Sequence, residues 1–207
     1  MRSNKIISEY SKLEFIQTIA REHFTGLEFP EAVFCKQEWG VYCLESWNIF
    51  SDSTFKNFKN FLNEIEEKSI FLIPDSFGQT NIEEYIFSLE VKGFQKSEYR
   101  AVLEFNTNFD FKAFNNFQEH YFYHNLDSLL IGSSTKWGLY VNTNINLIIL
   151  GFNPDIKKII DKFYKISEER ITSLDSVIDY VDIWAKKDKA DEVKRMIIKN
   201  YHKAFDH

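Results

Sequence analysis

Three short apolar segments in the second half of the chain constrain its fold more than any other feature. They cover Leu129–Ile131, Trp137–Val141 and Ile145–Leu150, and the turn-forming sequences Gly-Ser-Ser-Thr and Asn-Thr-Asn separate them. Short apolar runs joined by such turns are typical of adjacent antiparallel strands. Residues 128–152 therefore predict a β-meander, which belongs to a sheet that another layer must cover.

The middle segment indicates how the two faces of this sheet differ. Trp137, Leu139 and Val141 alternate with residues that are smaller or more polar. Successive side chains of a strand point to opposite faces, so the three large apolar side chains share one face. We expect a covered face on that side and a more polar face on the other.

Apolar residues recur at helical spacing in two segments before the meander and in three after it. The earlier stripes contain Leu13, Ile16, Ala20 and Phe24, and then Phe55, Phe58, Leu62 and Ile65. The later ones contain Ile156, Ile160 and Phe163, then Val177, Val181 and Trp184, and then Ala190, Val193, Ile197 and Tyr201. Further strands are predicted at 32–35, 41–47, 70–73 and 101–105, and another helix at 111–120. The chain is thus predicted as one α+β domain over residues 1–207, with a central, mainly antiparallel sheet and helices at both ends.

Residues 80–92 fit two structures. Thr80 and Glu83 have the spacing of a capping box, which favours a helix. The apolar residues from Tyr85 to Val91 alternate with polar ones, which favours a strand. The alternation leads us to predict a strand from Tyr85 onward.

The first predicted helix opens with a sequence that also carries a family resemblance. Ser11 and Glu14 form a capping box, in which each side chain bonds the backbone N–H of the other residue. Ile7-Ser8-Glu9-Tyr10 precedes the box and Phe15-Ile16 follows its glutamate. This order resembles the opening of the bacteriocin immunity proteins of the colicin and pyocin nuclease systems.

The resemblance implies a function and a partner. It implies tight binding to a cognate toxin domain, a nuclease being the expected one, through complementary charge and a few aromatic anchors. No cofactor, metal, catalytic residue or small-molecule substrate is expected. The colicin DNase immunity proteins are much shorter and all-helical, and their His-Pro-x-Gly-x-Asp pattern has no counterpart here, so no binding residue is carried over. The larger immunity proteins of contact-dependent and polymorphic toxin systems are mixed α+β, and this chain is more similar to those.

Acidic residues supply the candidate partner-binding surface. The net charge is −6, which disfavours nucleic acid and anionic membranes as partners and favours a basic protein. We assign two acidic groups as candidate contacts: Asp175, Asp179 and Asp182 along one predicted helix face, and Glu64, Glu66 and Glu67 at the end of another. Solvated helix surfaces without a partner are the alternative interpretation of both groups.

Two rival functions remain open at this stage. His120 and His124 stand four positions apart, as metal ligands on one helix face do, and Glu119 could assist them in a divergent hydrolase. The order differs from His-Glu-x-x-His, and no third ligand is evident. The other rival is a regulatory adaptor that pairs through a sheet edge or through the basic last helix.

The two cysteines and the apolar runs indicate the compartment. Cys35 and Cys43 are too few for a disulfide scaffold and lack zinc-site spacing, so both are predicted to be buried thiols. The sequence shows neither a secretory signal nor an apolar run long enough to span a membrane. We therefore expect a cytoplasmic protein.

Overall fold

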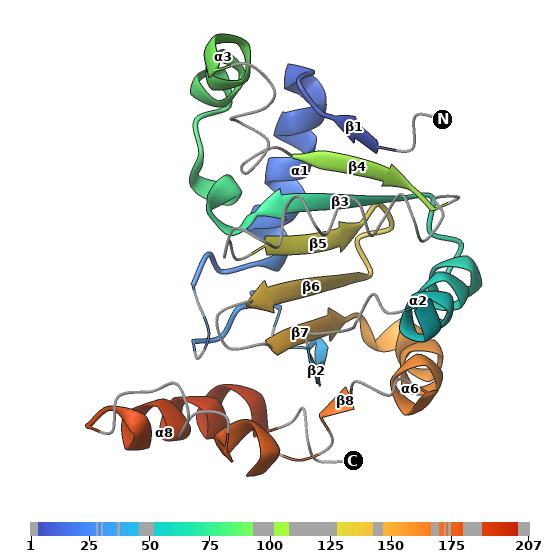
Figure 1. Cartoon of the computed structure of the whole chain (residues 1–207), viewed down its shortest axis with the longest axis vertical. Helices are drawn as coiled ribbons and strands as arrows, with labels where there is room; N and C mark the ends of the chain where they lie inside the picture. The colour runs from blue at the N-terminus through green and yellow to red at the C-terminus, as the bar shows by residue number, and fades with distance from the viewer. Residues whose placement is uncertain are drawn as a thin grey trace.

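A single antiparallel sheet with helices on both faces forms the centre of the molecule (Figure 1). The structure is a computed structural model. It describes residues 4–27, 29, 31–36, 38–45, 52–92, 102–107, 128–142, 147–166, 170–171, 173, 175–179 and 188–202. The predicted α+β class and its central antiparallel sheet are confirmed. The helix predicted at 111–120 lies outside the described residues.

Within the described ranges the sheet has eight strands, and every neighbouring pair is antiparallel. In chain order they are β1 (Asn4–Ile6), β2 (Gly40–Glu45), β3 (Ser69–Pro74), β4 (Leu103–Asn106), β5 (Ser128–Gly132), β6 (Trp137–Asn142), β7 (Leu147–Phe152) and β8 (Arg170–Ile171). Their order in space is β1-β4-β3-β5-β6-β7-β2-β8. The predicted meander is confirmed as β5, β6 and β7, and it lies in the middle of the sheet.

Helices pack on both sides of the sheet. They are α1 (Tyr10–His23), α2 (Asp52–Glu64), α3 (Ile82–Lys92), α6 (Lys157–Ile166) and α8 (Ala190–Tyr201), with short 3-10 helices η1 (Asp75–Gln79) and η4 (Pro154–Ile156). One core cluster joins the sheet to α1, α3 and α8, and a second joins it to α2 and α6. Figure 1 shows α2 and α6 next to each other, and the two pack together.

Both faces of the meander are buried, so the prediction of one polar face is wrong. Every residue of β6 and β7 is buried. Gly138 belongs to the face expected to be polar, and the Phe24 ring fills the space beside it: a Cβ there would lie 2.9 Å from Phe24 Cζ. On the same face the Tyr140 hydroxyl accepts from the N–H of Phe29 at 3.3 Å. Gly138 leaves room for a second helical layer, and the Tyr140 hydroxyl has a hydrogen-bond partner. This face of the sheet can therefore be buried.

The start of α1 differs from the predicted capping box. The helix begins at Tyr10, its N-cap is Glu9, and no side chain caps it. The Ser11 hydroxyl donates to the Glu9 carboxylate at 2.9 Å. Because Ser11 is already helical, its side chain stands two positions after the N-cap, too late to cap the first turn.

Residues 82–92 form the helix α3, so the strand predicted from Tyr85 is wrong. The cap is Asn81, whose Oδ1 accepts from the N–H groups of Glu83 at 2.9 Å and Glu84 at 3.1 Å. Tyr85 is buried, whereas Phe87 is 65 % exposed. Alternation placed these two side chains on the same face, but helical geometry separates them.

The segment predicted as a strand at 32–35 is irregular. It makes one isolated antiparallel bridge, between Phe24 and Phe34, whose rings lie 5.2 Å apart. Cys43 is buried as predicted, and burial raises the pKa of its thiol to about 12. Cys35 is exposed, which contradicts the prediction. Both cysteines are free thiols.

Candidate functional site

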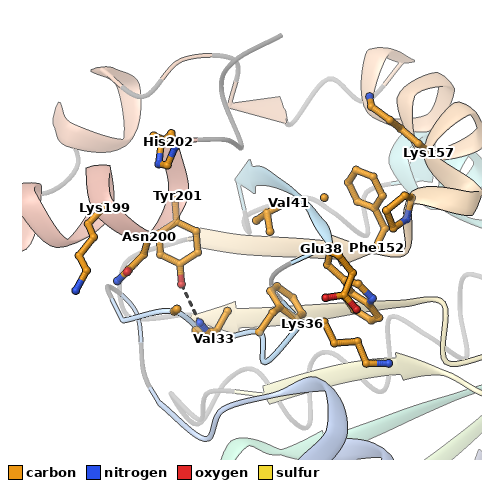
Figure 2. Close-up of a pocket in the computed structure, with 15 residues that line it drawn as sticks. Val33, Lys36, Glu38, Val41, Phe152, Lys157, Lys199, Asn200, Tyr201 and His202 are labelled. Carbon is orange, nitrogen blue, oxygen red and sulfur yellow. Dashed lines mark hydrogen bonds between the residues drawn. The ribbon is translucent and has the colours of Figure 1, made fainter.

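An open cleft lies where the end of α8 meets the segment before β2 and the junction of β7 with η4. Its volume is about 610 Å³. Figure 2 shows Tyr201 in its middle, with the side chains of Lys36, Lys157 and Lys199 spread around it. Its apolar lining includes Val33, Phe34, Trp39, Val41 and Phe152, and its polar lining includes Lys36, Glu38, Lys157, Lys199, Asn200 and His202.

Tyr201 ties the end of α8 to the opposite wall of the cleft. Its hydroxyl accepts from the N–H of Val33 at 3.1 Å and donates to the carbonyl of Glu31. The Tyr201 ring also packs on Phe29, with centroids 5.5 Å apart. Burial raises the pKa of this hydroxyl, which therefore stays protonated and keeps donating. Two segments far apart in the sequence are thus fixed as the walls of one cleft.

Because Gly40 has no side chain, it leaves room for the apolar floor of the cleft. It pairs with Phe152 across β2 and β7, and a Cβ at position 40 would lie 2.3 Å from the Phe152 ring. No side chain fits in that space. The ring of Phe152 therefore lies over the start of β2 and forms part of the floor.

Lys36 is held beside aromatic rings. Its ammonium lies 5.5 Å from the centroid of the Trp39 ring and 3.4 Å from Nε2 of the buried His23. The His23 ring meets Trp39 edge to face at 4.9 Å. A cation over an indole face is stabilised by the ring quadrupole, so the Trp39 ring helps to hold the Lys36 ammonium at the rim of the cleft.

Lys157 is held by a polar cluster that joins α6 to β2. Its ammonium donates to the Asp161 carboxylate at 2.9 Å and to the Tyr42 hydroxyl at 3.1 Å. The Tyr42 hydroxyl in turn donates to Asp161 at 2.5 Å. Asp161 offsets part of the charge of Lys157 but also fixes its position.

The titration of this cluster favours binding over proton transfer. The hydrogen bond to Asp161 is the largest cause that raises the pKa of Lys157, and burial is the largest that raises the pKa of Tyr42. Lys157 therefore remains a cation and Tyr42 a neutral phenol near pH 7. General acids and bases work best when their pKa lies near the working pH, which is not the case here.

Two of the three aspartates assigned from the sequence, Asp175 and Asp179, lie on a helix surface as predicted. Residues 175–179 are helical, and both Asp175 and Asp179 are exposed. Neither forms an ion pair with any residue in the described ranges. Val177 between them packs into the same core cluster as Tyr201, so these aspartates and the Tyr201 wall of the cleft belong to one face of the sheet. Asp182 lies outside the described residues.

The glutamates at the end of α2 do not form one acidic surface. Glu64 pairs with Lys162 of α6 at 2.8 Å, and Glu66 is exposed with a positive φ of 56°. Glu67 is only 4 % exposed, so its assignment as a partner contact is wrong. Since α2 packs on the other face of the sheet, the structure also separates these residues from Asp175 and Asp179.

Glu67 instead joins α2 to the β5–β6 turn. The left-handed Glu66 ends the helix, with the Glu67 N–H bonded to the Leu62 carbonyl at 2.8 Å, and so turns Glu67 inward. Its carboxylate accepts from both hydroxyls of Ser133 and Ser134, at 2.7 and 2.6 Å, and from the Ser134 N–H at 2.9 Å. The indole N–H of Trp137 completes the set at 2.9 Å. The turn serines therefore have a structural role, as anchors of a buried carboxylate.

The remaining sequence-based candidates are not brought into a site. His120 and His124 lie outside the described residues. Among the residues that the structure describes, no three His, Cys, Asp or Glu side chains lie together as metal ligands would. No helix in the described ranges has both the length and the apolar character needed to cross a membrane.

Comparison of the chain with protein-family models, curated proteins and solved structures found no match. The cleft and the exposed aspartates are therefore interpreted from their own geometry and charge.

Proposed function

We propose that this protein is a bacterial immunity protein, which binds a cognate toxin domain in the cytoplasm and blocks its active site or substrate surface. The observation that carries the proposal is the pair of exposed aspartates on one helix, Asp175 and Asp179, neither of which is neutralised by a cation among the described residues. The order of residues 7–16, with its resemblance to bacteriocin immunity proteins, supports it independently of the local geometry of Ser11. The proposed complex needs no cofactor.

Charge explains why a nuclease toxin would suit this surface. A protein that binds a nucleic-acid backbone presents lysines and arginines to the phosphates. An acidic surface on a chain of net charge −6 attracts the same basic groups. Such complementarity raises the rate of association and excludes partners of the wrong charge. The aspartates therefore compete with the substrate for the basic surface of the toxin.

Coexpression tests the proposed function directly. We expect growth to be restored when this protein is produced together with the toxin domain encoded beside its gene, because a stoichiometric complex occludes the toxin. The measurement is colony formation with toxin alone, with both proteins, and with an unrelated toxin as the control. Failure to rescue growth would contradict the proposed function. Turnover by the isolated protein that His124→Ala abolishes would exclude binding as its sole activity.

A second experiment tests the role of the aspartates. In the variant Asp175→Lys with Asp179→Lys we expect slower association with the toxin domain and a much weaker dependence of that rate on salt. Long-range attraction between exposed charges is screened beyond about 8 Å at physiological ionic strength. Association rates measured at low and high salt, with unfolding curves of both proteins, give the result.

The matched control changes two glutamates of α1. Glu14→Lys with Glu22→Lys alters the net charge by the same amount at exposed positions. Figure 1 shows α1 behind the β1, β4 and β3 side of the sheet, whereas α8 lies beyond the other edge. The control should keep most of the salt-dependent association. Equal rates for the two variants would mean that net charge alone matters and that Asp175 and Asp179 are an ordinary solvated surface.

A further inference from the structure

The lining of the cleft has the opposite charge to the chain as a whole. Among the described residues that line it, three are lysines, Lys36, Lys157 and Lys199, and one carries a carboxylate, Glu38, whereas the net charge of the protein is −6. The cleft is therefore a basic site on an acidic protein. Asp161 offsets Lys157 from outside the lining, whereas Lys36 and Lys199 form no ion pair with any residue that the structure describes.

The arrangement of these groups indicates the size of what binds. Figure 2 shows the three lysines on different sides of Tyr201, so one small anion could not contact all of them. A chain segment that crosses the cleft could do so. Between the lysines the floor is apolar: Trp39 and Phe152 are buried beneath it, and the half-buried Ala32 and Val41 expose apolar surface. Such a floor suits an apolar side chain flanked by acidic ones.

We propose that the cleft binds an acidic peptide segment of the protein partner, with one aromatic or aliphatic side chain on the floor and carboxylates at Lys36 and Lys199. The inference rests on the proposed function for the identity of that partner. It adds a contact of the opposite sign to Asp175 and Asp179, in a cleft whose Tyr201 wall lies on the same face of the sheet as these aspartates. Two patches of opposite sign fix the orientation of a partner better than one, because a reversed partner meets like charges.

The experiment uses the full chain and synthetic peptides, so it needs no toxin. The acetylated amide Asp-Asp-Phe-Asp-Asp is titrated into isotope-labelled protein, and amide and indole NMR shifts are followed. We expect shifts at Trp39 and around Lys36 and Lys199. Replacement of the peptide Phe by Ser, or of its Asp residues by Lys, should abolish binding.

Charge-matched variants locate the binding site. In Lys36→Glu with Lys199→Glu we expect the dissociation constant to rise by about tenfold or more. Lys158→Glu with Lys189→Glu changes net charge equally at exposed positions outside the lining and should retain most of the affinity. Lys199→Glu alone serves if the change at Lys36 disturbs the packing on Trp39.

Several results would overturn the inference: no binding, equal binding of the basic peptide, shifts away from the cleft, or equal loss of affinity in both double variants. None of these results bears on whether the protein rescues growth from the toxin. The proposed function and the peptide site can therefore fail separately.

Discussion

Replacement of Trp137 by alanine is expected to lower the free energy of unfolding by about 3 to 5 kcal/mol, as removal of a buried aromatic side chain does. Trp137 is 0 % exposed. Its ring meets those of Phe58 at 5.7 Å and Phe61 at 5.5 Å, both edge to face, and thereby joins β6 to α2. The alanine variant would leave a cavity between sheet and helix and remove one hydrogen bond from the Glu67 carboxylate.

Urea unfolding followed by circular dichroism measures this change. Trp137→Phe is the matched control, because it keeps much of the packing and removes the indole N–H, and it should cost clearly less than the alanine variant. If Trp137→Ala kept the stability of the parent but lost binding to the toxin domain, Trp137 would be an interface residue and the core described here would be wrong.

Local patterns predicted the central elements well. The three strands of the meander were predicted because apolar runs of strand length alternate with turn-forming residues within one short stretch of chain. The start of η4, which leads into α6, also depends on local features: the Asn153 side chain accepts from the N–H of Asp155 at 2.8 Å, and Pro154 follows at the first helical position. These features depend on neighbouring residues alone.

Predictions failed where two local patterns indicated different secondary structures, or where contacts with distant segments determine the structure. In residues 80–92 a capping-box spacing favoured a helix and alternation favoured a strand. In the observed helix Tyr85 packs against Phe77, with the two rings 5.6 Å apart. At the start of α1 the N-cap is Glu9, two residues before the predicted cap Ser11. The second covering layer of the sheet depends on the contact between Phe24 and Gly138, which strand alternation could not indicate.

The candidate site was predicted only in part for the same reason. The exposure of Asp175 and Asp179 follows from helical periodicity around Val177. The cleft requires residues near positions 36, 157 and 199 to meet, and no sequence pattern links them. Glu67 was predicted to be an exposed partner contact because it follows two other glutamates at a helix end. The left-handed backbone of Glu66 instead turns it into the core.

Replacement of Glu67 by alanine is the second large effect that we expect, a loss of about 2 to 4 kcal/mol in the free energy of unfolding. The carboxylate satisfies four donors, and the buried indole N–H of Trp137 and the Ser134 N–H would lose their acceptor. It also fills the space over Gly132, where a Cβ would lie 2.1 Å from Oε2.

A double-mutant cycle separates the hydrogen bond from the packing. Glu67→Gln keeps the shape of the side chain but replaces one acceptor oxygen by an amide N–H₂. This group would face the serine and indole donors, so the variant should be destabilised although its side chain has the same size. Combined with Trp137→Phe, it should cost less than the sum of the two single changes, by about 1 kcal/mol, because both remove one shared interaction. Glu66→Gln is the control, since its exposed side chain should be replaceable at almost no cost. Strict additivity of Glu67→Gln and Trp137→Phe would mean that the carboxylate and the indole act independently, and stability of Glu67→Ala equal to the parent would return Glu67 to the candidate partner contacts.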